Sequence, residues 1–277
     1  MKKYGVKGVV PMLVVALVLG LATSVFAAGN WSFGVKGGMG FMAPLIAGGD
    51  FGSESWNDTV DDINQLLEDA KDLIEDMGGT ASINLAEKIT RGWNVEGYGQ
   101  YRITKTFGLR GSVGYLTGMK STFGGELEDW DDLSGKATAT ISASCLFLSL
   151  EPVMTLPMGN FLLTFGAGPG YYMQKSSISA NLELADSWDT LLDLTIDAPL
   201  SGSKIGYRGF LGGEYSTGSL TIGAELGYMS TGQIETTGEV TITGEVFGEP
   251  PVDETEEVTG KLDFTGLYIL FGIGFAV

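Results

Sequence analysis

The residue types that most often carry catalysis and metal binding are scarce in this sequence. His is absent and Cys occurs once, at Cys145, so the usual catalytic base and the commonest metal ligand are both missing. A serine hydroxyl is a poor nucleophile without an adjacent base, and no G-x-S-x-G elbow occurs. One Cys cannot form an internal disulfide, so we expect Cys145 to be a small buried residue. We therefore predict a non-enzymatic protein without a cofactor or a dedicated metal site.

Carboxylates are the abundant ionisable groups, with 34 acidic against 16 basic residues. A surface this acidic repels nucleic-acid phosphates, so we expect no nucleic-acid partner. Two acidic runs invite a calcium interpretation, but they lack the spacing and the glycine of an EF-hand loop. We expect solvated surface charge there, with divalent cations as candidate partners. The runs are Glu126, Glu128, Asp129, Asp131 and Asp132, and then Asp253, Glu254, Glu256 and Glu257.

Apolar and polar residues alternate with period two from Gly29 onward, which is typical of strands with two different faces. A transmembrane strand needs about 9 to 11 residues. The segments with this pattern are 31–42, 91–104, 109–115, 137–151, 161–167, 207–215, 220–228 and 267–277. They predict an all-β fold, an eight-stranded antiparallel up-and-down transmembrane β-barrel, with a soluble sandwich as the alternative.

The connections between these segments alternate in length, as they do in outer-membrane barrels. Tight turns are expected near Thr106, Met158 and Gly218. Long connections are expected at 43–89, 121–136, 179–203 and 243–260, and the third of these has room for an extra hairpin. All acidic residues except Glu96, Glu151, Glu214 and Glu225 lie in or beside the long connections. We expect the long, acidic connections to be extracellular loops and the short turns to be periplasmic.

The N-terminus has the pattern of a secretory signal peptide. Basic residues precede an apolar run over 9–22, and Val25-Phe26-Ala27 provides a signal-peptidase site. We expect a signal peptide over 1–27 and a barrel domain over 28–277, with a retained N-terminal anchor as the alternative. Export and a barrel together predict the outer membrane of a diderm bacterium.

Eight charged residues have the strand phase that points into the barrel lumen. They are Lys36, Arg102, Arg110 and Arg208, with Glu96, Glu151, Glu214 and Glu225. Eight strands leave an interior just wide enough for side chains, so we predict an ion-pair network that seals the lumen. The alternative is a polar path for small solutes. Lumen glycines such as Gly114 and Gly166 either leave a narrow passage or admit the rings of Phe147, Phe210 and Tyr268.

One amphipathic helix is predicted in the first long connection, over 58–77. Its apolar stripe is Val60, Ile63, Leu67, Ala70, Ile74 and Met77, widened by Leu66 and Leu73. The other face is acidic and should not lie on anionic lipopolysaccharide unless divalent cations bridge the two. We therefore expect the helix to dock as a lid on the extracellular rim, against Val240, Ile242, Leu262 and Phe264.

Four segments resemble the strands and turns of small outer-membrane β-barrel proteins, the family that includes OmpX, OmpW and the OmpA membrane domain. They are FGVKGGMGF, EGYGQYRITKTFGLRGSVGYL, FGAGPGYY and LYILFGIGFAV. This family usually ends on an aromatic residue, whereas here Phe275 is third from the end. The enzymes among such barrels use a His, which this chain lacks. The resemblance implies contact with outer-membrane lipid and lipopolysaccharide.

Two functions follow from these patterns. The first is a non-enzymatic structural or surface-interaction role, indicated by the balanced lumen charges and the large acidic loops. The alternative is a passive channel or binding barrel for small or hydrophobic solutes, implied by the resemblance to the OmpW-like branch and by the lumen glycines.

Overall fold

A computed structural model describes residues 30–42, 45–48, 56–130, 133–186, 189–247 and 250–276. The predicted signal peptide and its cleavage site lie outside these residues. Within them, no helix has both the length and the apolar character needed to cross a membrane.

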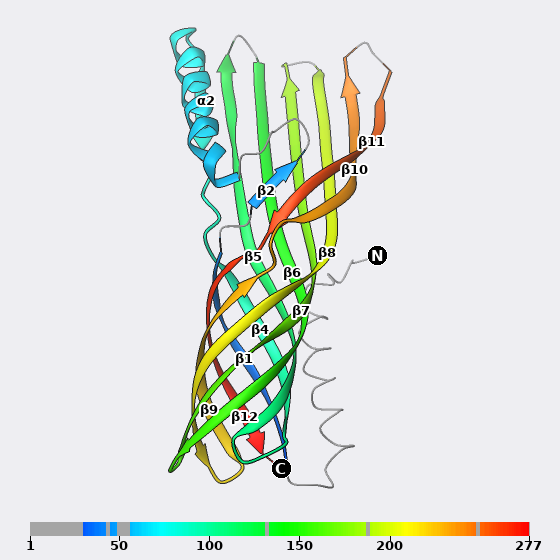
Figure 1. Cartoon of the computed structure of the whole chain (residues 1–277). Coiled ribbons are helices and arrows are strands. Elements are labelled where there is room, and N and C mark those ends of the chain that lie inside the picture. The colour runs from blue at the N-terminus through cyan, green and yellow to red at the C-terminus, as the bar shows by residue number, and fades with distance from the viewer. Residues whose placement is uncertain are drawn as a thin grey trace, which may run out of the picture.

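Eight strands pair in a closed antiparallel ring (Figure 1). They are β1 (Trp31–Met42), β4 (Gly92–Arg102), β5 (Phe107–Trp130), β6 (Leu133–Met158), β7 (Phe161–Ala185), β8 (Thr190–Thr217), β9 (Leu220–Ser230) and β12 (Gly266–Ala276). Each pairs with the next in chain order, and β1 closes the ring against β12. The predicted tight turns are confirmed between β4 and β5, β6 and β7, and β8 and β9. We call this side of the ring the turn end and the opposite side the loop end.

The outer face of the ring is apolar, as expected of a surface that contacts lipid hydrocarbon. Trp93 and Tyr207 are 62% and 68% exposed, and Tyr101 and Tyr215 lie eight residues further along the same strands. Leu211 is exposed between Tyr207 and Tyr215. We call this outer surface, from the turn end up to Tyr171 and Ile205, the apolar belt.

The chain departs from a plain eight-stranded barrel at the loop end. The strands β5 to β8 are 24 to 28 residues long, whereas β1, β4, β9 and β12 have 11 or 12. Residues 121–136 and 179–203, predicted as loops, are therefore mostly strand. Four further strands lie at this end: β2 (Leu45–Gly48), β3 (Thr80–Asn84), β10 (Ile234–Val246) and β11 (Val252–Asp263).

These segments form what we call the upper sheet, in the order β3-β5-β6-β7-β8-β10-β11-β2. Its inner face continues the lumen side of the ring and carries apolar residues such as Ile178 and Ile196. Its outer face carries polar residues such as Ser179 and Asp197. The same alternation thus runs through the predicted loops, but their serines, threonines and acidic residues resembled loop sequence.

The predicted helix is confirmed as α2 (Trp56–Asp76). Two asparagines fasten it to the segment that follows β3. Asn57 exchanges hydrogen bonds of 2.8 and 2.9 Å with the backbone of Ile89, and Asn64 exchanges bonds of 2.7 and 3.0 Å with that of Ala86. The helix ends before Gly78, which has a positive φ of 89° that favours glycine.

The structure does not place α2 as a lid over the mouth. The helix contacts β2, β3 and β5 and stands upright at the loop end (Figure 1). Only its first turns are well buried, at Trp56 and Val60. Along the rest of the predicted stripe, Ile63, Leu67 and Ile74 are half-buried, whereas Ala70 and Met77 are exposed. The asparagine bonds hold α2 on the β3 side. Of the four predicted partners, Val240 and Ile242 belong to β10, whereas Leu262 and Phe264 are buried in the same cluster as Trp56 and Val60.

Candidate functional site

Strands on different sides of the ring project charged side chains into the lumen. Lys36 on β1 is the cross-strand neighbour of Glu96 on β4, and Arg110 on β5 that of Glu151 on β6. Arg208 on β8 is buried beside them, and so is Glu225 on β9. The alternation places all of these groups on the lumen face because successive residues of a strand point to opposite sides.

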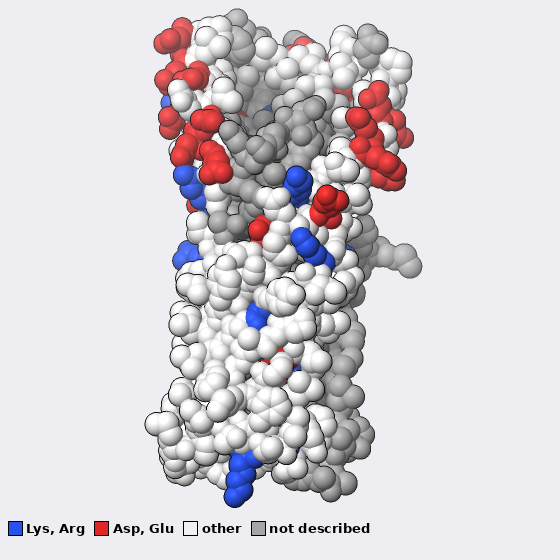
Figure 2. All heavy atoms as spheres, viewed as in Figure 1, with Lys and Arg blue, Asp and Glu red and all other residues white. Residues whose placement is uncertain are grey.

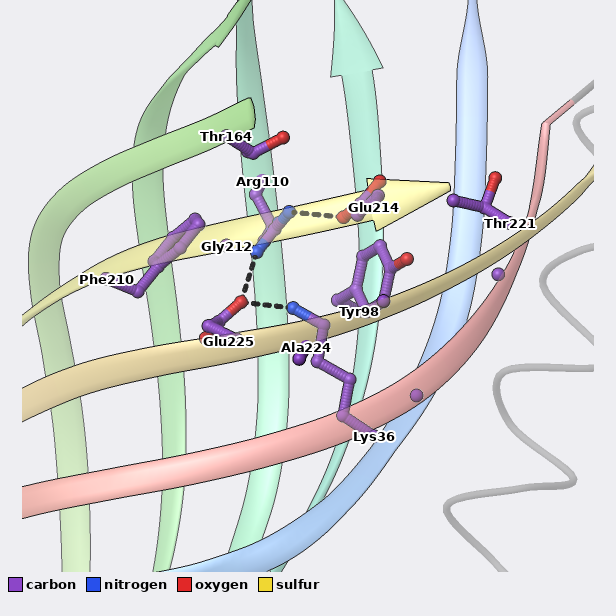
Figure 3. A pocket seen from close by; sticks show the side chains of 13 residues that line it. Lys36, Tyr98, Arg110, Thr164, Phe210, Gly212, Glu214, Thr221, Ala224 and Glu225 are labelled. Atoms are coloured by element: carbon purple, nitrogen blue, oxygen red, sulfur yellow. Dashed lines mark hydrogen bonds and ion pairs between the residues drawn. The ribbon is translucent and has the colours of Figure 1, made fainter. Parts of the chain in front are cut away.

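Glu225 is the centre of this lumen network (Figure 3). Its Oε2 atom accepts hydrogen bonds from Lys36 Nζ and, at 2.9 Å, from Arg110 Nη1. Its Oε1 atom accepts bonds of 3.2 Å from Arg208 Nη2 and from the Tyr268 hydroxyl. One carboxylate therefore joins three cations from three strands.

Arg208 holds the other side of the network. It donates a 2.8 Å hydrogen bond from Nη1 to Glu96 Oε2, and its Nε atom lies 3.3 Å from Glu151 Oε1. It also donates to the Tyr268 hydroxyl, at 2.8 Å from Nη2. The guanidinium packs over the ring of Phe147, 5.1 Å from its centroid. Arg208 thus offsets three buried carboxylates, counting Glu225.

Arg110 links the network to the turn end. Its Nε and Nη2 atoms donate to Gln100 Oε1 at 3.2 and 3.1 Å, and its Nη2 atom lies 3.6 Å from Glu214 Oε1. Its guanidinium is sandwiched near Phe210 and Tyr98, at 4.3 and 4.8 Å from the ring centroids. Glu214 is the most exposed carboxylate of the network, with 19% of its side chain accessible.

The structure brings together seven of the eight predicted lumen residues and leaves Arg102 out. Arg102 is the last residue of β4, half-exposed beside the turn, and it has no ion pair among the described residues. The network therefore has three cations and four carboxylates. Sequence reasoning assigned Gln100, Tyr98 and Tyr268 no part in the network, although their strand phase places all three on the lumen face.

Lumen glycines hold aromatic rings in place. A Cβ atom built on Gly114 would overlap the ring of Phe147, and one built on Gly227 would overlap the ring of Tyr268. A Cβ on Gly166 would lie 2.8 Å from Phe210. Of the two predicted uses of such glycines, the structure thus has the one that admits rings.

Little open space is left around the network. A cavity of about 10 Å³, enough for about one water molecule, lies beside Lys36, Arg110, Glu214 and Glu225. Nearer the loop end, tightly packed apolar side chains fill the interior. Leu116, Met119, Met229 and Leu270 are at most 1% exposed.

The chemistry of the site is electrostatic. No cluster of three or more carboxylate or thiol groups suited to a metal ion occurs in the described part of the chain. Cys145 is buried, as expected, among apolar neighbours. The acidic run at 126–132 includes residues outside the described ones, and in its described part Glu126 pairs with Lys136.

Known proteins show where such a chain belongs. The family model described as "Outer membrane protein beta-barrel domain" matches residues 13–275. No curated protein sequence matches the chain significantly. Among solved structures, the outer membrane protein OprG from Pseudomonas aeruginosa is 13% identical, with a TM-score of 0.42, and the match covers 91% of this chain and 98% of OprG.

Two further solved structures are similar at comparably low sequence identity. Ail, the attachment invasion locus protein of Yersinia pestis, is 11% identical with a TM-score of 0.31, covering 90% of this chain and 100% of Ail. A major outer membrane protein from Thermus thermophilus is 14% identical with a TM-score of 0.29, covering 89% of this chain and 99% of that protein. Because the family model spans nearly the whole sequence, this chain belongs to the outer-membrane β-barrel protein family and resides in the outer membrane of a Gram-negative-type bacterium.

Proposed function

We propose that this protein is a non-enzymatic outer-membrane barrel with a closed lumen, whose role is structural or lies in interactions at the cell surface. The observation that carries the proposal is the lumen network, in which Lys36, Arg110 and Arg208 converge on Glu225. Aromatic rings pack against this network, and the adjacent cavity holds about one water molecule. A conducting pore needs a continuous column of water, and the close packing around the network supports a lumen without one.

We propose further that the upper sheet faces the outside of the cell and the turn end faces the periplasm. Short turns on the periplasmic side are the rule in this architecture. The apolar belt then contacts lipid, and the polar outer face above it contacts lipopolysaccharide. Divalent cations would bridge its carboxylates to anionic lipopolysaccharide groups. Protease treatment of intact cells should cleave within 43–89 or 243–260, and labelling at Thr106 or Gly218 instead would invert this orientation.

The closed lumen is tested by reconstituting the purified protein in planar bilayers. We expect no steady conductance from the native chain. Discrete, reproducible channels would overturn the proposal. An Arg102→Ala variant serves as a control, because this residue lies outside the network and its loss should leave the membrane equally tight.

The second candidate function is a passive channel or binding barrel for small or hydrophobic solutes. One observation favours it: the apolar inner face of the upper sheet leads down to the apolar layer around Leu116 and Leu270. Uptake of a small hydrophobic solute into liposomes distinguishes the two functions. Faster uptake with the protein than with empty liposomes would support this second function.

A further inference from the structure

The inner face of the upper sheet carries an apolar patch across three neighbouring strands. Leu182 on β7 pairs with Leu194 on β8, and Ile196 on β8 pairs with Ile242 on β10. Leu182 is 41% exposed, and the other three are half-buried. The opposite ring strands do not reach this height, because β1 ends at Met42 and the others are equally short. This patch is therefore an apolar sheet face that no ring strand covers.

The helix α2 shows how an amphipathic segment packs on this face. Its Trp56 stacks on Phe123, an inner-face residue of β5, with the ring centroids 5.4 Å apart. Val60 is buried in the same cluster, and Ile63 packs against it. The helix thus covers the β3–β5 part of the inner face, and the apolar patch lies further along the sheet, on β7, β8 and β10.

Acidic side chains flank the patch on both sides. On β11, Glu254 and Glu256 have the inner-face phase and pair with Ile242 and Val240. On the other side, α2 carries a row of exposed carboxylates, and its single cation, Lys71, is paired with Glu75 at 2.7 Å. Figure 2 shows the two acidic groups on opposite sides of the loop end, over α2 and over β10–β11.

We infer that the patch is a docking surface for a cationic amphipathic peptide. An apolar floor between two acidic walls matches a helix with one apolar face and basic flanks. Anionic lipid and a second copy of this acidic chain would both meet like charges at the walls. A neutral apolar ligand would leave the carboxylates unused. Between α2 on β5 and the carboxylates of β11 lie the four strands β6, β7, β8 and β10, which span about 14 Å, enough for one helix about 10 Å wide.

This inference rests on the proposed surface-interaction role, and it is tested by direct binding. The full chain is placed in nanodiscs of phosphatidylcholine and titrated with a fluorescent 18-residue Leu/Lys amphipathic helix. We expect saturable binding above that of empty nanodiscs, and the binding should weaken with salt. A scrambled peptide of equal charge should bind more weakly, because it has no apolar face.

Matched variants separate the patch from general electrostatics. Glu254→Gln with Glu256→Gln removes two inner-face charges, whereas Asp193→Asn with Asp197→Asn removes two from the outer face of β8. We expect the first pair to weaken binding by about three- to tenfold and the second to have little effect. Leu182→Ser with Leu194→Ser should weaken binding similarly, with far-UV circular dichroism checking that the sheet is retained.

Several results would overturn the inference. The first is an absence of binding by the native chain, and the second is equal weakening of binding by the two double charge variants. An uncharged Leu/Ser helix that binds as well as the Leu/Lys helix, or self-association of the chain that Leu194→Ser abolishes, would also contradict it. Conductance in bilayers is an independent readout. If the chain conducts and binds the peptide, the proposal of a closed lumen is wrong and the docking surface is supported. If the barrel does not conduct and does not bind the peptide, the closed lumen is supported and the docking surface is wrong.

Discussion

The two halves of β8 carry their apolar residues on opposite faces. The apolar residues point outward in the ring and inward in the upper sheet. In the ring, it places Arg208 in the lumen and Tyr207 and Leu211 on the outside. In the upper sheet, it places Leu194 on the inner face and Asp193 on the outside. The pairing between β7 and β8 runs through both halves without a register shift up to Leu184. The inversion is therefore a change in the residues and not in the pleat.

The environment outside the barrel explains this difference. In lipid, the outward residues must be apolar, and a narrow lumen can hold charges only as a paired network. Beyond the lipid, the outward residues contact water and turn polar, and the inner residues become the apolar side. The change occurs on β8 between Ile205 and Ser203, next to Tyr171, whose hydroxyl donates a 2.7 Å hydrogen bond to Ser203. This level marks the upper limit of the apolar belt.

The largest expected effect separates the lumen network from a charge outside it. Arg208→Ala leaves Glu96 and Glu151 buried without their cation, so it should lower the free energy of unfolding by about 3–5 kcal/mol. Arg102→Ala should lower it by less than about 1 kcal/mol, because that side chain is half-exposed. Urea unfolding in detergent micelles measures both. Equal decreases in the free energy of unfolding would mean that the buried network stabilises the barrel no more than a half-exposed charge does.

The next effect tests the upper limit of the belt on one face of one strand. Leu211→Arg places a charge against lipid and should destabilise by about 2–4 kcal/mol. Thr195→Arg lies on the same face of β8 in the upper sheet and should stay within about 0.5 kcal/mol. Both are measured by unfolding in lipid bilayers. A large loss at Thr195 would place the upper sheet in lipid and break the comparison.

A smaller effect tests ring packing in the lumen. Gly227→Ala forces the ring of Tyr268 to move and should cost about 1–3 kcal/mol. Gly209→Ala is the matched control, because its Cβ would point outward with its nearest neighbour at an ordinary 3.5 Å. Thermal unfolding of the two variants should differ in this direction. Indistinguishable melting temperatures would contradict the tight packing of Gly227 against the ring of Tyr268.

The smallest effect on overall stability is expected at α2. Val60→Asp should release the helix, because it puts a carboxylate into a site that is 2% exposed. Hydrogen exchange should then rise in α2 and stay low in the strands of the ring. Leu66→Asp is the control at a side chain that is 68% exposed, and it should leave exchange unchanged. Loss of protection throughout the ring after Val60→Asp would show that α2 is part of the barrel's cooperative unit.

Periodicity in the sequence was enough to locate the strands of the ring and the helix. Residues at period two must lie on one face of a strand, so the alternation placed Lys36, Arg110 and Glu225 in the lumen without knowledge of their partners. The stripe from Val60 to Met77 located α2 to within two residues at either end. Composition misled where the strands leave lipid, because there the outer residues are serines and acids.

Only the tertiary structure decided which lumen residues form ion pairs and where α2 lies. Glu225 meets Lys36 across 189 positions of sequence, and how far each strand is staggered in the closed ring determines that contact. The same stagger leaves Arg102 at the rim although its phase is correct. The sequence by itself determined that an amphipathic helix exists, because helix periodicity is local. Its place beside β3 depends on two asparagines whose backbone partners are far along the chain, which no local pattern specifies.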